Sequence, residues 1–151
     1  MCTEKELSFA TFMLYSLSDA WNKTPADVYK VLNSTGVLDG YIIEAYDVLH
    51  TLGKQYLVED VTELVKEKGI ELSLHEADEK DKILGIYKQE LENDIIHNIS
   101  EIKNIGIRKA MDLYYSSNMA NKISMMKEGI DTMDAKKLAK NIIRSKSDLE
   151  R

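Results

Sequence analysis

The chain has very few of the residues that interrupt helices or crosslink small folds. It contains one proline and seven glycines in 151 residues, so long helices can form over most of its length. The single cysteine, Cys2, excludes a disulfide framework and a thiolate metal site, and it suits a reducing cytoplasm. Because no long apolar run occurs, we expect neither a signal peptide nor a membrane-spanning segment.

The motifs of common enzyme sites are also missing. Neither GxGxxG nor GxxxxGK[ST] occurs, which argues against a nucleotide-phosphate loop. The three histidines, His50, His75 and His97, are scattered and form no HExxH pattern. We therefore predict no catalytic residue, no metal and no cofactor, and we expect that the protein is not an enzyme.

Charge is unevenly distributed along the chain. The net charge is −6, yet residues 106–151 carry ten basic and six acidic residues. An acidic protein is poorly suited to coat nucleic acid, because phosphate contacts need clustered cations. The basic C-terminal region keeps a DNA-binding alternative open, and its last helix offers these candidates: Lys136, Lys137, Lys140, Asn141 and Arg144.

Apolar residues recur at intervals of three and four, which predicts an all-α fold. The first such series runs from Leu7 to Trp21. Thr24 and Pro25 then give an N-cap and first-turn signal, and Gly36 gives a stop. A further helix is predicted through residues 41–49, and another from Tyr56 to Gly69.

The second half begins with a long helix, which we predict from residue 77 to residue 103. The prediction rests on apolar residues spaced by three and four: Ile83, Ile86, Tyr87, Leu91, Ile95, Ile99 and Ile102.

The second half repeats the pattern of the first. An offset of about 82 residues pairs Asn22 with Asn104 and Gly36 with Asn118, and an offset of about 81 pairs later positions. Glycine and asparagine both tolerate the left-handed conformation that ends helices. The matched positions are structural ones, which favours a divergent tandem duplication.

This repeat divides the chain into two small helical-bundle modules of about four helices each. The modules comprise residues 1–70 and 83–151, and a short linker, residues 71–82, joins them. Ile70, Leu72 and Leu74 alternate with polar residues, so the linker includes either an extended segment or a short strand.

The stretch EAYDVLHTLGKQYLVEDV, residues 44–61, has the most site-like composition. His50 comes three residues before Gly53, where a histidine can donate to the last carbonyl groups of a helix. A small-molecule site around His50, Tyr46 and Tyr56 is the alternative. The sequence alone leaves both interpretations open.

Aromatic side chains are the best candidates for contacts with a protein partner. Tyr114 and Tyr115 point to adjacent helical faces, so we expect at least one of them not to be fully buried. The residues that we predict to bind a partner are Tyr46, His50, Tyr56, Tyr114 and Tyr115.

The segment STGVLDGYIIEAYDVLHTLGKQYLVEDVTELVKEKG resembles a family of small bacterial proteins, the domain of unknown function numbered 3791. Its pattern is carried by Gly36-Val37, Asp39, Tyr46 to Thr51, Gly53, Tyr56, and Val58 to Asp60. The resemblance covers about the first 70 residues. Residues 90–146 resemble a related group of small proteins.

The resemblance implies a small partner protein encoded beside an ADP-ribosyltransferase-like protein, in a toxin and antitoxin arrangement. It supplies no catalytic residues. Our first hypothesis is therefore an antitoxin-like protein-interaction module whose acidic surface covers the cationic pocket of the toxin. A DNA-binding autoregulator and a small-molecule sensor around His50 are the alternatives, and a second copy of the chain is a further candidate partner.

Overall fold

The computed structural model describes residues 3–72, 79–126, 129 and 133–149, and these residues form helices and loops without a strand. The predicted all-α class is therefore confirmed. The helices are α1 (Glu4–Trp21), α2 (Pro25–Thr35), the π-helix η1 (Leu38–Ile43), α3 (Tyr46–Leu49), α4 (Lys54–Glu67), α5 (Glu79–Lys103), α6 (Ile107–Tyr115), α7 (Asn118–Met125) and α8 (Ala135–Leu149).

The start and stop signals around α2 act as the sequence predicts. The Thr24 hydroxyl oxygen accepts a hydrogen bond from the Asp27 amide, at 3.2 Å, and Pro25 occupies the first turn. Gly36 ends the helix with φ of 80°, in the left-handed region that favours glycine. Local chemistry therefore determines both ends of this helix.

The predicted helix through residues 41–49 is instead two short pieces. Residues Leu38–Ile43 form a π-helix, and Tyr46–Leu49 form a single turn of α-helix. Between them Ala45 leaves the helical region, with φ of −96° and ψ of 19°. Of the two alternatives for the linker, the short strand does not form where it can be judged, since Ile70 to Leu72 form no strand; Leu74 lies outside the described residues.

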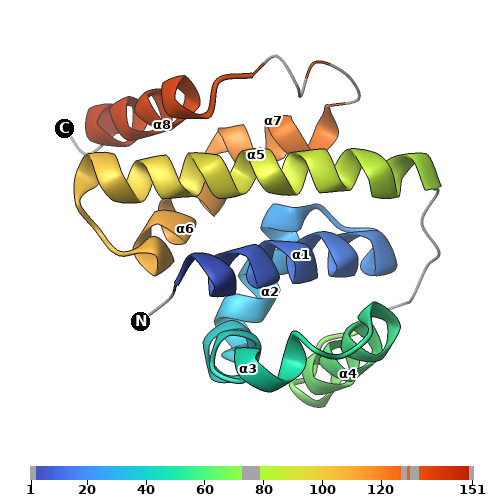
Figure 1. Cartoon of the computed structure of the whole chain (residues 1–151). Helices are drawn as coiled ribbons and strands as arrows, with labels where there is room; N and C mark the ends of the chain where they lie inside the picture. The colour runs from blue at the N-terminus through green and yellow to red at the C-terminus, as the bar shows by residue number, and fades with distance from the viewer. Residues whose placement is uncertain (1–2, 73–78, 127–128, 130–132, 150–151) are drawn as a thin grey trace.

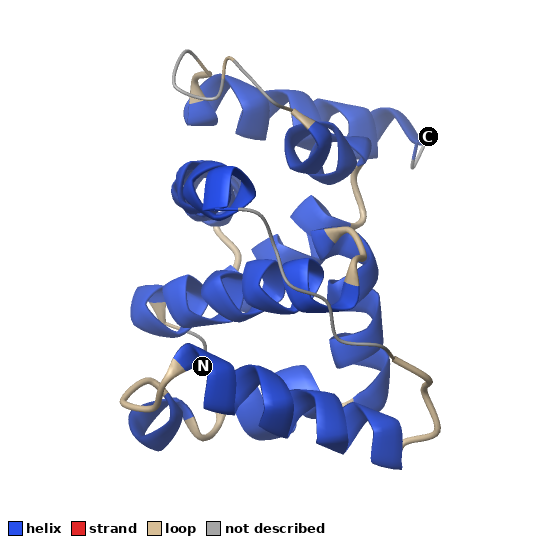
Figure 2. Ribbon diagram, turned by 90° about the vertical axis from the view of Figure 1, so that its right-hand side faces the viewer, coloured by secondary structure: helices blue, strands red, loops and turns tan. Residues whose placement is uncertain are grey.

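The long helix α5 runs through the middle of the molecule, with α8 packed on one side and α1 on the other (Figure 1). Figure 2 shows the same stack of helices from the side. One cluster of buried apolar side chains joins α1, α2 and α4 to α5, α6 and α8. The two halves of the chain therefore share a hydrophobic core.

The two longest helices, α1 and α5, end in the same way, 82 residues apart. Asn22 and Asn104 both adopt the left-handed conformation, with φ of 54° and 55°. The amide after each asparagine donates to the carbonyl oxygen of Ser18 or Ser100, at 3.1 and 3.0 Å. Each serine hydroxyl donates to the carbonyl of that same following residue. The Asn22–Asn104 pairing seen in the sequence thus corresponds to one shared cap geometry.

The second pairing does not share its conformation. Gly36 is left-handed, but Asn118 is the first residue of α7, after the N-cap Ser117. The chain re-enters a helix directly after the two-residue turn at Ser116 and Ser117, so no left-handed residue is needed there. The expectation that Asn118 matches Gly36 as a left-handed cap is wrong.

Replacing either cap asparagine tests this account of the helix ends. Asn22→Ala places a β-carbon without a compensating amide in the left-handed region, so we expect it to lower the unfolding free energy by about 1 kcal/mol. Asn22→Gly should have little effect or should stabilise the protein. Urea unfolding of both variants, and of the same pair at Asn104, measures this. Equal stability of the alanine and glycine variants would contradict it.

Candidate functional site

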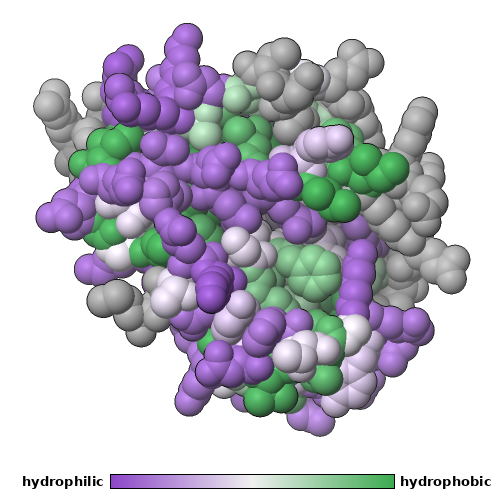
Figure 3. Space-filling view, in the orientation of Figure 1, coloured by the Kyte–Doolittle hydropathy of each residue, from purple (hydrophilic) through white to green (hydrophobic). Residues whose placement is uncertain are grey.

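The joint between α3 and α4 is a continuous exposed stretch. Every residue from His50 to Tyr56 is exposed, and three large apolar side chains reach solvent around it. The exposed fractions are 65% for Val48, 38% for Leu52 and 58% for Tyr56. In Figure 3 hydrophobic atoms lie among hydrophilic ones over α3 and α4, at the lower edge of the molecule.

Tyr46 and His50 pack against each other beside this joint. Their rings stack with centroids 4.4 Å apart and planes 13° from parallel, and Tyr46 meets the Phe9 ring edge-on at 5.6 Å. His50 Nδ1 lies 2.7 Å from the Tyr46 carbonyl oxygen, which can only accept, so this nitrogen donates. This is the geometry of a helix C-terminal cap. The exposed His50 is thus tied to its own helix.

Exposed charges around the joint are mainly acidic. Glu44, Asp47, Glu59 and Glu63 are exposed, and Lys54 is the exposed cation between them in sequence. An acidic rim around exposed apolar side chains favours a partner with a basic surface.

Tyr114 and Tyr115 are both buried, so the expectation that at least one is not fully buried is wrong. Their side chains are 0% and 3% exposed. The Tyr114 hydroxyl reaches into the core to Glu92, while the Tyr115 ring stacks on Tyr29 of α2, with centroids 4.7 Å apart. Adjacent faces of α6 both meet protein because α6 is enclosed by α5 and α2. Neither tyrosine is exposed enough to anchor a protein partner, although we predicted that role for both.

The tyrosines surround a buried carboxyl group, that of Glu92 on α5, which is 0% exposed. Tyr15 of α1 and Tyr114 donate to its Oε1 at 2.8 and 2.9 Å, and Tyr115 donates to Oε2 at 3.1 Å. Burial raises the pKa of Glu92 to about 7, although the three hydroxyl donors and the charge of Lys88 act in the opposite direction. One carboxyl group thereby connects three helices.

A second polar group from the same face of α5 is also buried. Lys88 is 6% exposed, and its Nζ donates to the carbonyl oxygen of Ser124 on α7, at 2.7 Å. One turn later, Asn93 Oδ1 accepts from the Thr11 hydroxyl of α1, at 2.8 Å. A Lys and a Glu four residues apart usually indicate a solvated helix face, so the sequence pattern concealed this interior position.

Because Lys88 and Glu92 are buried, the opposite face of α5 is exposed to solvent. At its N-terminal end the buried positions are Gly85, where an added β-carbon would lie 3.7 Å from the Tyr15 ring, and Lys88. Ile83, Ile86 and Tyr87 point to solvent instead, with exposed fractions of 56%, 55% and 57%. We call these three residues the α5 patch, and Figure 3 shows hydrophobic side chains over this end of α5.

The α5 patch does not share a face with Ile95 and Ile99, although all of these residues belong to one series spaced by three and four. Ile95 and Ile99 are 0% exposed, so only part of the series is buried. Ile102 is also exposed, at 43%. Spacing by three and four residues finds a helix but cannot identify which of its faces is covered when polar residues occupy the interior.

Residues 8–68 match the model of a family described as "Protein of unknown function (DUF3791)". This confirms the resemblance of the first 70 residues and places the α3–α4 joint inside the matched segment. Comparisons with curated proteins and with solved structures give no match.

The histidines do not form a metal centre in the part of the chain that the structure describes, where no group of three or more His, Cys, Asp or Glu is placed to hold a metal. His97 instead bridges two carboxylates, with Nδ1 2.7 Å from Glu4 Oε1 and Nε2 3.0 Å from Glu101 Oε1. His75 lies outside the described residues. No described helix is long and apolar enough to cross a membrane.

Titration of Glu92 should be visible in the pH dependence of stability. Its pKa is about 7 in the folded protein against an ordinary 4.5, so the folded state holds the proton more tightly over that interval. The contribution to stability is complete below pH 4.5 and is lost as the pH rises towards 7. Glu92→Gln removes this titration and keeps the shape of the side chain.

We therefore expect the unfolding free energy of the native chain to fall across this interval relative to Glu92→Gln. Urea unfolding of both proteins between pH 4.5 and 7, and above pH 7, measures the difference between their unfolding free energies. The contributions of the other titrating groups cancel in this difference. Parallel curves for the two proteins would show that Glu92 titrates normally in the folded state.

Proposed function

We propose that this protein is a non-enzymatic protein-interaction module, an antitoxin-like partner of an ADP-ribosyltransferase-like protein encoded beside it. The observation that carries this proposal is the α5 patch: three large apolar side chains, each more than half exposed, on one turn of a long helix. The toxin and antitoxin arrangement comes from the family resemblance.

The α5 patch has the spacing of a helix that docks into a groove. Ile83, Ile86 and Tyr87 occupy positions i, i+3 and i+4, which lie together on one helical face. Full burial of an exposed side chain of this size contributes about 1.5–3 kcal/mol, and these three are little more than half exposed, so each contributes about half of that when covered. Together the three can still anchor a specific contact. The helix that carries them is held by α1 and α8, which reduces the entropy cost of binding.

The α3–α4 joint supplies a second, acidic contact. Val48, Leu52 and Tyr56 are exposed there, and the surrounding charges are mainly carboxylates. An acidic rim of this kind complements the cationic pocket of an enzyme that binds a phosphate-bearing nucleotide. We place this contact in the reducing cytoplasm, which the single cysteine suits.

We further propose that the two halves arose by tandem duplication and remain two related modules. The equivalent ends of α1 and α5, with left-handed Asn22 and Asn104, support this proposal. So do the starts of α2 and α6, which lie 82 residues apart at Pro25 and Ile107. α4 and α8 begin 81 residues apart, in line with the change of offset in the sequence.

Co-purification with the product of the neighbouring gene tests the interaction. We expect the tagged chain to recover that protein stoichiometrically, and we expect Ile86→Asp to reduce recovery at least about tenfold, because a carboxylate would then have to be desolvated at the contact. Ile102→Asp is the matched control, since Ile102 is an exposed isoleucine on the same helix outside the α5 patch. Circular dichroism checks that both variants fold.

Two outcomes would contradict this proposal. If the wild type does not bind the neighbouring protein, the antitoxin-like function is wrong. If the wild type binds but Ile86→Asp and Ile102→Asp behave alike, the α5 patch is not the contact.

A second candidate function is DNA binding by α8. The observation that favours it is the exposure of five predicted DNA-contacting residues on this helix: Lys136, Lys137, Lys140, Asn141 and Arg144. Lys136, Lys140 and Arg144 follow one another at intervals of four, so they line one side of the helix. The helix packs on α5 through Ala139 and Ile142, which leaves this side free.

Fluorescence anisotropy with duplex DNA from the promoter region tests this candidate. We expect affinity to fall steeply with salt, and a Lys136→Gln/Lys140→Gln/Arg144→Gln variant to show a salt slope smaller by about three, one for each lost phosphate contact. No binding at low salt, or an unchanged slope in the variant, would rule out α8 as a DNA contact.

A further inference from the structure

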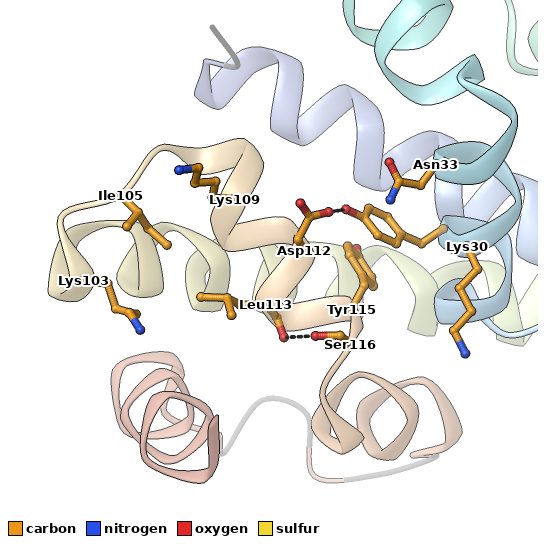
Figure 4. A pocket seen from close by; sticks show the side chains of 10 residues that line it. Lys30, Asn33, Lys103, Ile105, Lys109, Asp112, Leu113, Tyr115 and Ser116 are labelled. Atoms are coloured by element: carbon orange, nitrogen blue, oxygen red, sulfur yellow. Dashed lines mark hydrogen bonds between the residues drawn. The ribbon is translucent and has the colours of Figure 1, made fainter. Parts of the chain in front are cut away.

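A groove lies between α2, the end of α5 and α6, on a face that neither the α5 patch nor the α3–α4 joint reaches. Its volume is about 620 Å³, within the range of small-molecule sites. Figure 4 shows Lys30 of α2 and Lys103 of α5 at opposite ends, with the side chains of α6 between them. The groove is therefore built from both halves of the chain.

The floor of this groove is apolar, and two stacked tyrosine rings form one of its walls. Leu113 and Ile105 are partly buried in it, and the edges of Tyr29 and Tyr115 close it on the side of α2. The two tyrosine rings stack on each other and are 5% and 3% exposed, so they offer an apolar wall and not an open ring face. A ligand that fits this floor needs an apolar body.

The rim carries a charge opposite to that of the protein as a whole. Lys30, Lys103 and Lys109 line the groove and are exposed, and over the described ranges none of the three forms an ion pair. The chain itself has a net charge of −6. Three exposed cations on an acidic protein make a local site of positive potential.

The carboxylate that lines the groove does not neutralise these lysines. Asp112 Oδ1 accepts from Arg108 Nη1 at 2.7 Å and also from the Tyr29 hydroxyl. Arg108 is held in place by further bonds, to Asp39 Oδ1 at 2.8 Å and to Asn33 Oδ1 at 2.6 Å. Asp112 is thus committed to the α2–α6 contact, and the charges left for a ligand are the ammonium groups.

We propose that this groove binds a small organic anion: an apolar body that rests on Leu113 and Ile105, with a carboxylate, phosphate or sulfonate group held by the lysines. Lys30 and Lys103 lie at opposite ends of the groove, so an acidic group at either end meets a lysine with a flexible stem. This site is separate from the proposed partner contacts, so its existence does not depend on them.

A matched pair of fluorescent probes tests this proposal. Anilinonaphthalene sulfonate has an apolar ring system with one anionic group, and N-phenylnaphthylamine has the same rings without the charge. We expect saturable binding of the sulfonate at one site, at least about tenfold tighter than binding of the neutral probe and weakened by salt. Equal affinities for the two probes, or no saturable binding of the sulfonate, would overturn the proposal.

Variants then locate the site. Lys30→Gln/Lys103→Gln/Lys109→Gln should weaken sulfonate binding about tenfold and leave the neutral probe unaffected. The matched control, Lys5→Gln/Lys66→Gln/Lys68→Gln, removes three exposed lysines that lie on α1 and at the end of α4, outside the groove, and should bind like the wild type.

Amide chemical shifts from NMR give a reading that does not rely on substitutions. On titration with the sulfonate, the changes should cluster at Ile105, Leu113 and Ser116. Changes centred on the α5 patch, or equal losses in the two triple variants, would show that the probe binds elsewhere and would overturn the proposal.

Discussion

Glu92 sits where water does not reach, and the positions of three helices depend on how its carboxyl group is satisfied. A buried carboxyl group without partners costs several kcal/mol, so donors must be brought to it. Tyr15 of α1 and Tyr114 and Tyr115 of α6 supply them. The donors come from both halves of the chain. The contact therefore fixes the orientation of α1 and of α6 relative to α5.

The rotation of α5 follows from this contact. With Glu92 and Lys88 inward, the helix turns Ile83, Ile86 and Tyr87 outward. The exposed apolar surface that we propose as the partner contact is thus a consequence of polar groups in the interior. One of the three tyrosines that bond Glu92, Tyr115, also forms part of the wall of the lysine-rimmed groove. The buried contacts of Glu92 therefore affect both the α5 patch and the lysine-rimmed groove.

Capping and stop residues in the sequence predicted where helices begin and end better than residue spacing predicted which helix faces are buried. The cap at Thr24, the stop at Gly36 and the helix-terminal position of His50 are encoded by neighbouring residues, and the structure agrees with each. We expected at least one of Tyr114 and Tyr115 not to be fully buried because adjacent residues point to different faces, but Tyr114 meets α5 and Tyr115 meets α2. The break at Ala45 depends on the chain path between α2 and α4, which residue spacing does not record.

The buried polar network is the feature that the sequence concealed. Lys88 and Glu92 have the spacing of a surface ion pair, and only the convergence of tyrosines from residues 15, 114 and 115 shows that Glu92 is internal. The repeat offset of about 82 residues offered the one long-range signal, since it relates α1 to α5 and α2 to α6 before any contact is known.

The central claim is that this chain binds a protein partner through the α5 patch. Hydrogen–deuterium exchange of the chain alone and in complex with the neighbouring-gene product tests it most directly, because the readout is local and needs no substitution. The account predicts slower exchange over residues 83–90 in the complex, with a second protected segment at the α3–α4 joint. Unchanged exchange at residues 83–90 in a stable complex, or the failure of any complex to form, would contradict it.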